Sequence, residues 1–178
     1  QGVTKELGIY KQTTRVYPFV LGAQPARLLD MAVAYATVAN DGLRPTPAFV
    51  EKVAKDGKIV WERQRNNLQR LPSVDRVSFY QLRRILEGTL VRGTATRLKR
   101  WAGSVAGKTG TSNDSNDVWF MGFTNDITVG VWVGYDNRRI RGSLGGQFTG
   151  GRVALPIAEQ VLDASFKVFK ERVSLPPA

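Results

Sequence analysis

Two segments of the chain repeat their apolar residues at the spacing of an amphipathic helix. The first begins after Pro25 and ends at Asn40-Asp41-Gly42, because proline is favoured in a first turn and a polar triplet with glycine stops a helix. The second runs from about Asp75 to Val91, with Ser73 or Asp75 as its cap and a glycine-marked exit over residues 92–98. The residues expected to face inward are Leu28, Met31, Tyr35 and Val38 in the first helix, and Val77, Leu82, Ile85, Leu86 and Leu90 in the second.

Two further regions have the composition of β-hairpins. Residues 45–64 predict one, because apolar-rich arms flank Lys55-Asp56-Gly57 and Asp-Gly favours the positive backbone angles of a tight turn. Residues 117–124 and 127–136 predict another, because both runs are rich in β-branched and aromatic residues and Asn125-Asp126 separates them.

The second hairpin is apolar on both faces. Val118 and Phe120 point to one side, and the other side carries Trp119, Met121 and Phe123. A sheet that is apolar on both faces must be covered on both, so we expect helices above and below it.

The rest of the chain completes this arrangement. Residues 104–111 are expected to form a third strand beside the hairpin, and a glycine-rich loop leads to a last helix from Pro156 to Phe169. The apolar stripe of that helix comprises Ile157, Val161, Leu162 and Phe166. The final Ser174–Ala178 is expected to be a linker or a frayed end. The predicted fold class is α+β, an antiparallel sheet flanked by helices.

Composition removes several kinds of site. The 178 residues suffice for one domain, and the sequence contains no Cys and no His. A thiol nucleophile, a Ser-His-Asp triad and the usual zinc sites are therefore excluded, and any general base must be Lys, Asp, Glu or Tyr. We expect no cofactor and no metal. The lack of Cys slightly favours an extracytoplasmic protein, and no apolar run approaches the roughly 20 residues of a membrane-spanning helix.

The net charge of +11 would suit an anionic neighbour such as nucleic acid, lipid head groups or an acidic polymer. The basic residues are scattered in short groups, among them Arg83-Arg84, Arg97 with Lys99-Arg100, and Arg138-Arg139 with Arg141. None belongs to a recognisable nucleic-acid-binding motif, so we expect solvated surfaces and no specific nucleic-acid partner.

The stretch GSVAGKTGTSNDSND, residues 103–117, fits two motifs. Gly107-Lys108-Thr109 could end a phosphate-binding loop, but that loop needs a glycine five positions before Gly107, where Ala102 stands. A helix should also follow at once, whereas turn residues and a strand follow here. The phosphate-loop interpretation is therefore rejected.

Lys108-Thr109-Gly110 is also the substrate-side motif of serine enzymes that penicillin attacks. In that role Lys108 and Thr109 would hold a substrate carboxylate, and Gly110 would leave room for the substrate backbone. The backbone N–H of Thr111 would face a developing oxyanion.

The chain resembles the C-terminal part of the transpeptidase domain of class A penicillin-binding proteins. The resemblance spans roughly Leu7 to Phe169 and rests on ordered motifs: LGAQPARLLDMAVAYATVANDGLRPTP, RGTA, AGKTGTSND, DVWFMGFT, VWVGYDN and FTGGRVALPI. It implies a serine acyl-enzyme that cross-links peptidoglycan stem peptides ending in D-Ala-D-Ala and that β-lactams inhibit. It assigns the family's strand lysine to Lys108, its hydroxyl partner to Thr109 and its oxyanion amide to Thr111, with Trp119 and Phe120 as packing behind the strand. It further implies a membrane anchor, a glycosyltransferase domain and an extracytoplasmic location.

Two family motifs are missing. No serine is followed three positions later by lysine, so the nucleophile's Ser-x-x-Lys is absent, and Thr111-Ser112-Asn113 only approximates Ser-x-Asn in the wrong element. Both motifs lie upstream in the family, so we interpret residues 1–170 as the C-terminal portion of the domain and 171–178 as a tail. The chain alone is expected to be inactive.

Three expectations follow from that interpretation. The partners are stem peptides, β-lactams and the missing N-terminal part of the same domain. The strand at residues 127–135 should present a bare edge, which favours self-association. The alternative is a non-catalytic wall-binding or interaction module, while a class B enzyme and a β-lactamase are disfavoured by VWVGYDN and by the lack of a deacylating base.

Overall fold

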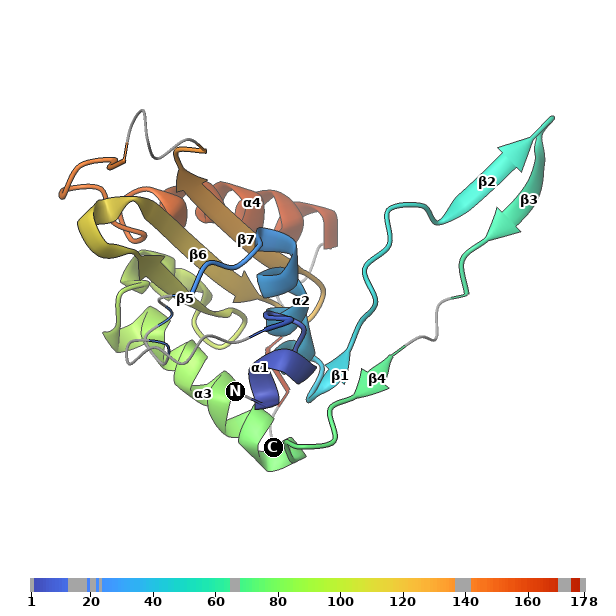
Figure 1. Ribbon diagram of the computed structural model, residues 1–178, viewed down its shortest axis with the longest axis horizontal. Coiled ribbons are helices and arrows are strands. Elements are labelled where there is room, and N and C mark those ends of the chain that lie inside the picture. The colour runs from blue at the N-terminus through green and yellow to red at the C-terminus, as the bar shows by residue number, and fades with distance from the viewer. Residues whose placement is uncertain are drawn as a thin grey trace.

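The centre of the molecule is an antiparallel sheet. The computed structural model describes residues 2–12, 19, 22, 24–64, 68–136, 142–169 and 174–176, and in this part of the chain three strands pair in the order β5-β6-β7 (Figure 1). They are β5 (Ala106–Thr111), β6 (Asp117–Phe123) and β7 (Thr128–Gly134). The hairpin prediction is confirmed, since the Thr124 N–H donates to the Ile127 carbonyl at 2.9 Å across Asn125-Asp126.

Helices cover both faces of the sheet, as its two apolar faces predict. Helix α4 (Ala154–Phe169) packs on one face, where the turn η2 (Thr96–Trp101) adds Leu98 and Trp101 to a core around Phe120. Helix α2 (Leu28–Ala39) lies on the other face, and α3 (Arg76–Arg92) runs beside β5. The core on this side contains Val38, Leu71, Phe79, Leu86, Ala106, Phe123 and Leu175. Burial there raises the pKa of Tyr35 to about 12.

Several residues predicted to face inward are exposed. In α3, Val77, Leu82 and Ile85 lie on the surface, and in α4 the same holds for Ile157 and Val161. The residues that are buried instead are Phe79, Arg83, Leu86, Glu87 and Leu90 in α3, and Ala154, Leu155, Ala158 and Leu162 in α4. In α2, Leu28 is exposed and Val33, Ala34, Thr37 and Val38 are buried.

Ion pairs make the polar burial in α3 possible. Arg83, 2% exposed, donates to Asp41 Oδ1 at 3.0 Å and to the Pro176 carbonyl at 2.8 Å. Glu87 accepts from Arg84. A paired charge can be buried where an unpaired one cannot. The buried face of α3 therefore includes charged residues, and the spacing of apolar residues alone does not predict it. The cap prediction for this helix is confirmed, because Asp75 accepts from the Ser78 N–H at 2.8 Å.

The first predicted hairpin forms a projecting arm. Strands β2 (Lys52–Lys55) and β3 (Lys58–Glu62) pair through the turn Asp56-Gly57, whose φ angles of 53° and 76° confirm the predicted positive values. The short pair β1 (Leu43–Arg44) and β4 (Gln69–Arg70) joins the arm to the body. Every residue of β2 and β3 is exposed, and the arm extends away from the sheet and helices (Figure 1).

The C-terminal segment is docked, so the prediction of a linker or frayed end was wrong for its described residues 174–176. Leu175 is 7% exposed, and its N–H donates to the Gly103 carbonyl at 2.8 Å. Asn125 Nδ2 donates to the Ser174 carbonyl at 2.9 Å. A leucine at this position fills a gap in the α2–α3 core, which sequence pattern could not reveal. Residues 171–173 and 177–178 of the predicted tail lie outside the described residues, and so do Arg138, Arg139 and Arg141.

Two further observations concern the surface. The outer edge of β7 has no neighbouring strand within the residues that the structure describes, and the strand contains no charged residue and no proline. Self-association through this edge stays a prediction.

Of the helices in the described ranges, including α1 (Gly2–Glu6), none has the length and apolar character needed to cross a bilayer.

Candidate functional site

The four predicted site residues follow one another on β5, next to β6. The strand starts in the core at Ala106 and Gly107 and becomes accessible at Lys108, Gly110 and Thr111. The ammonium of Lys108 donates to the Thr109 carbonyl at 2.7 Å. Because side chains alternate along a strand, Lys108 and Gly110 share one face and Thr109 and Thr111 the other. The structure thus presents a cation on one face of β5 and a hydroxyl on the opposite one.

The hydroxyl of Thr109 already has a partner. It lies 2.5 Å from the hydroxyl of Thr94, in the segment that follows α3, and Thr109 is only 8% exposed. The substrate role assigned to Thr109 stays a prediction, and in this structure its hydroxyl holds β5 against that segment. The hydroxyl of Thr111 is more accessible and accepts from the Gly150 N–H at 3.0 Å.

Gly150 allows the loop before α4 to touch the backbone of β5. A Cβ atom on Gly150 would lie 2.4 Å from the Gly110 carbonyl oxygen and 2.5 Å from that of Trp119. Backbone atoms cannot yield to such a contact, so only glycine fits here. The loop therefore closes over β5 and β6 beside Gly110 and Thr111.

Helix α3 holds the buried end of β5. The hydroxyl of Thr89 donates to the Gly107 carbonyl at 2.5 Å and also to the Leu86 carbonyl at 2.9 Å. Together with Thr94 and Gly150, it fixes the strand at three successive points, Gly107, Thr109 and Thr111. Such fixation keeps backbone N–H groups in place without reorganisation during a reaction, which is what electrostatic stabilisation of an oxyanion requires.

The turn η3 (Asn113–Ser115) connects β5 to β6 and has a structural role. Ser112 Oγ accepts from the Asp117 N–H at 2.8 Å, and the carboxylate of the buried Asp117 accepts from Trp132 Nε1 at 2.9 Å. Residues 111–113, which approximate Ser-x-Asn, therefore lie where β5 ends and this turn begins.

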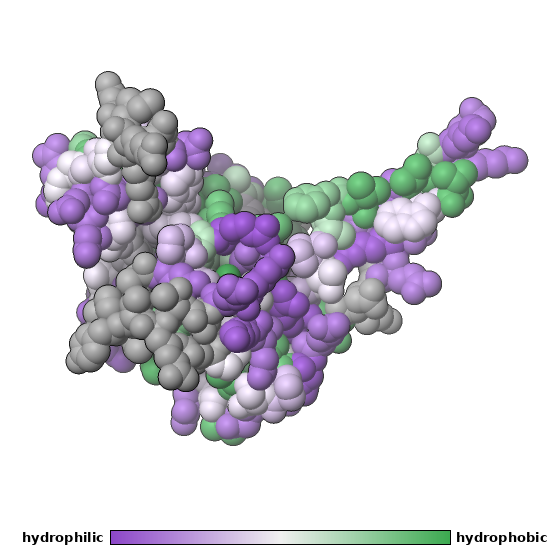
Figure 2. Space-filling model, viewed as in Figure 1, coloured by the Kyte–Doolittle hydropathy of each residue, from purple (hydrophilic) through white to green (hydrophobic). Residues whose placement is uncertain are grey.

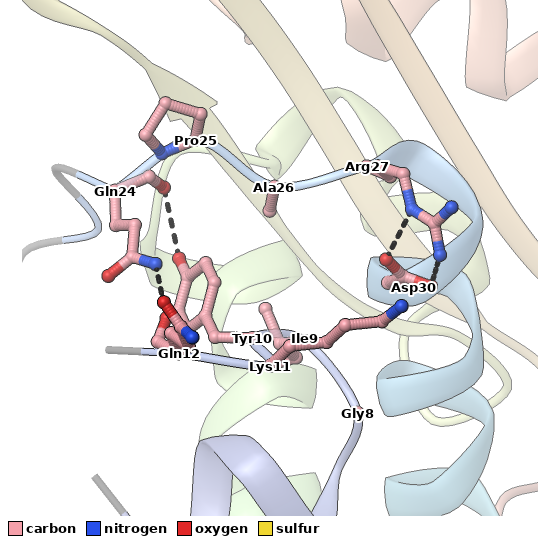
Figure 3. A pocket seen from close by; sticks show the side chains of 10 residues that line it. All are labelled: Gly8, Ile9, Tyr10, Lys11, Gln12, Gln24, Pro25, Ala26, Arg27 and Asp30. Atoms are coloured by element: carbon pink, nitrogen blue, oxygen red, sulfur yellow. Dashed lines mark hydrogen bonds and ion pairs between the residues drawn. The ribbon is translucent and has the colours of Figure 1, made fainter. Parts of the chain in front are cut away.

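A hollow lies away from β5. It has a volume of about 480 Å³ and is formed by residues 8–12 together with residues 24–27 and Asp30 (Figure 3). Tyr10 donates to the Gln24 carbonyl at 3.0 Å, and Arg27 pairs with Asp30 at 2.7 Å. Its lining includes no residue of β5, so it is separate from the lysine-bearing strand. Across the described ranges no cluster of acidic side chains could hold a metal ion.

Sequence reasoning missed the residues that hold β5. Thr94 and Gly150 lie inside the motifs RGTA and FTGGRVALPI, but the sequence pattern assigns no role to these individual residues. Thr89 carries no signal at all, because a threonine near the end of a helix has many possible functions. The contacts depend on how α3 and the loop dock, which local sequence does not specify.

Comparison with known proteins gives consistent results. Residues 26–163 match the family model of the penicillin binding protein transpeptidase domain. Penicillin-binding protein 1A of Rickettsia conorii is 37% identical over 195 aligned residues, covering 98% of this chain and 24% of that protein. The chain thus spans about a quarter of the length of this relative.

Solved structures show the same fold. Penicillin-binding protein 1A from Haemophilus influenzae has a TM-score of 0.83 at 23% identity, over 97% of this chain and 31% of that one. An imipenem acyl-enzyme complex of penicillin-binding protein A from M. tuberculosis has a TM-score of 0.68 at 22% identity, over 93% of this chain and 42% of that one.

Proposed function

The chain belongs to the penicillin-binding protein transpeptidase family, and from this premise we propose that it supplies the substrate-binding strand of a serine D,D-transpeptidase. The enzyme would cross-link peptidoglycan stem peptides through an acyl-enzyme, and β-lactams would acylate the same serine. The acyl-enzyme formed by the M. tuberculosis neighbour with imipenem supports the β-lactam part of this proposal.

One observation carries the proposal. Lys108 is exposed on β5, and its ammonium donates to the Thr109 carbonyl of its own strand. Contacts with Thr89, Thr94 and Gly150 fix that strand in place. An exposed cation on a strand whose backbone is held in place suits a ligand that ends in a carboxylate and passes through an oxyanion. The N–H of Thr111 would serve that oxyanion.

The nucleophile is not in this sequence. No Ser-x-x-Lys is present, so the reacting serine and its lysine would come from another part of the domain. By analogy with the family, the working enzyme would be anchored to a membrane and face the extracytoplasmic space. The chain by itself would bind no β-lactam covalently.

Fluorescent penicillin tests this function. The chain alone should show no covalent adduct, whereas a polypeptide that also contains the family's Ser-x-x-Lys segment should be labelled. In that longer protein, Lys108→Ala should slow acylation by on the order of 100-fold, because it removes charge from the oxyanion and carboxylate site. Lys99→Ala, at an exposed position of η2, is the matched control and should leave the rate unchanged.

Two results would count against the proposal. An adduct on any serine of the chain alone would show that the nucleophile had been missed. Unchanged acylation in the Lys108→Ala protein would show that β5 does not take part in the site.

A further inference from the structure

The projecting arm exposes more apolar surface than its size warrants. Its exposed large apolar residues are Phe49, Val50, Val53, Ile59, Val60 and Trp61, and Phe49 is 87% exposed. Figure 2 shows apolar residues along the arm and hydrophilic ones at its tip. An isolated two-stranded hairpin is marginally stable in water, and an exposed apolar patch usually marks a contact surface. We therefore expect the apolar surface of the arm to be covered by a binding partner.

The sequence of β3 is complementary to itself. If two copies of Lys58–Glu62 pair antiparallel about Val60, Lys58 of each copy lies opposite Glu62 of the other. Ile59 then lies opposite Trp61 in both directions. Pairs of opposite charge, and pairs of an aromatic with a β-branched residue, are favourable across strands. Every pair on either side of Val60 is therefore favourable in this one register.

Val60 is placed to lie on the axis of such a pair. Within the hairpin, Trp61 pairs with Val53 and Ile59 pairs with Ala54, so the bulge leaves Val60 without a partner on β2. A two-fold axis through Val60 would give it the same residue of a second copy as its neighbour.

Strand β2 cannot pair with itself in the same way. In Lys52–Lys55, an antiparallel copy would set Lys52 against Lys55, which is a repulsive pair. Association would therefore use one edge of the arm and close on itself as a dimer with two-fold symmetry, without growing into a fibre.

We propose that a second copy of this chain is the binding partner of the arm, and that the two copies join through antiparallel β3–β3 pairing about Val60. The two arms form a four-stranded sheet in the order β2-β3-β3-β2, which has the strand number that an independent sheet needs. The charge pattern of β3 favours this partner. A lipid bilayer fits less well, because the outer edges of the arm would carry unpaired backbone N–H and C=O groups into hydrocarbon. The proposal is independent of the proposed transpeptidase function.

Charge reversal tests the register. Sedimentation velocity of the chain from micromolar to near-millimolar concentration should show a monomer–dimer equilibrium. Lys58→Glu should raise the dissociation constant by roughly tenfold, because two pairs of like charges then face each other across the axis. Glu62→Lys should also weaken the dimer, but it removes the ion pair between Lys52 and Glu62 within the arm as well, so Lys58→Glu is the cleaner variant. Lys55→Glu, which makes the same charge change on β2, should have little effect.

The mixture of the two variants is the decisive sample. Lys58→Glu and Glu62→Lys proteins, each weakly associating alone, should form a heterodimer when combined, since every facing pair is then of opposite sign. The double variant K58E/E62K should dimerise again by itself. Circular dichroism checks that each variant is folded, which is expected because the arm lies outside the core.

Four results would overturn the proposal. The first is a monomer at every concentration. The second is association that Lys58→Glu does not weaken, which would point to the β7 edge instead. The third is variants that fail to recover on mixing. Binding of the unmodified chain to vesicles of anionic phospholipid without dimer formation would assign the arm to a membrane surface and overturn it as well.

Discussion

The hydroxyl of Thr94 lies 2.5 Å from the hydroxyl of Thr109, which links the exit of α3 to the middle of β5. Thr94 is exposed and Thr109 is buried. The bond therefore gives the buried hydroxyl of Thr109 a hydrogen-bond partner on a surface segment. It also attaches the lysine-bearing strand β5 to the end of α3, and α3 contacts β5 again through Thr89.

Replacing Thr94 should therefore destabilise the chain through Thr109. Thr94→Val keeps the shape of the side chain but leaves a buried hydroxyl unsatisfied, and we expect a loss of about 1 kcal/mol in the free energy of unfolding. Urea denaturation measures it. Thr94→Ser retains the hydroxyl and should stay close to the original stability, and equal stability of the Val and Ser variants would argue against the bond.

Gly150→Ala should be more damaging. The added Cβ would meet the carbonyl oxygens of Gly110 and Trp119, and displacing the loop should destabilise the chain by about 2 kcal/mol. Gly146→Ala is the control in the same loop, because a Cβ there meets no atom within 4 Å. If both alanine variants unfold at the same urea concentration, the loop does not lie as close to the backbone of β5 as described.

The docked C-terminal segment can be tested at Leu175. Leu175→Ala should cost about 2 kcal/mol by the loss of buried apolar contact, and thermal or urea unfolding measures it. Leu68→Ala removes the same atoms from an exposed side chain and should change stability by less than about 0.5 kcal/mol. Stability that is insensitive to Leu175 would mean that the segment does not belong to the core.

Glu87 should make stability depend on pH. Burial raises the pKa of its carboxyl, while the nearby Arg84 and Arg83 act in the opposite direction. With the folded-state pKa above the unfolded one, the folded state binds more protons between the two values. The stability contributed by the protonated form is then lost as the pH rises through that interval.

The comparison with Glu87→Gln isolates this effect. The amide does not ionise, so the free energy of unfolding of the unmodified chain should fall relative to that of the variant as the pH rises past the ordinary pKa of a glutamate. Parallel pH profiles for the two proteins, measured by urea unfolding, would contradict the raised pKa.

The outer edge of β7 can be examined by hydrogen exchange. Alternate N–H groups of an edge strand point outward, and those of residues 128–134 should exchange fast in dilute solution. If the bare edge drives association, they should become protected at high concentration, also in the Lys58→Glu variant. Exchange that does not change with concentration would exclude the edge as a contact.

Much of the fold could be predicted from short stretches of sequence. Asp56-Gly57, the cap at Asp75 and the opposite faces of Phe120 and Phe123 each carry their structural reason within a few residues, and all three predictions are confirmed. The inward faces of α3 and α4 could not be predicted in the same way. Ile85 and Val161 have core-like side chains, yet the docking of each helix leaves them on the surface.

For the candidate site, the order Lys108-Thr109-Gly110-Thr111 and its place on a strand beside β6 follow from the sequence alone, because strand formation and motif spacing are local properties. The tertiary structure decided the rest. It placed Thr94 against Thr109, Gly150 against Gly110 and Leu175 in the core, and it left the arm without a neighbour in the described residues. The physical reason is that hydrogen bonds and steric fits between distant segments depend on how the elements pack, and no single segment contains that information.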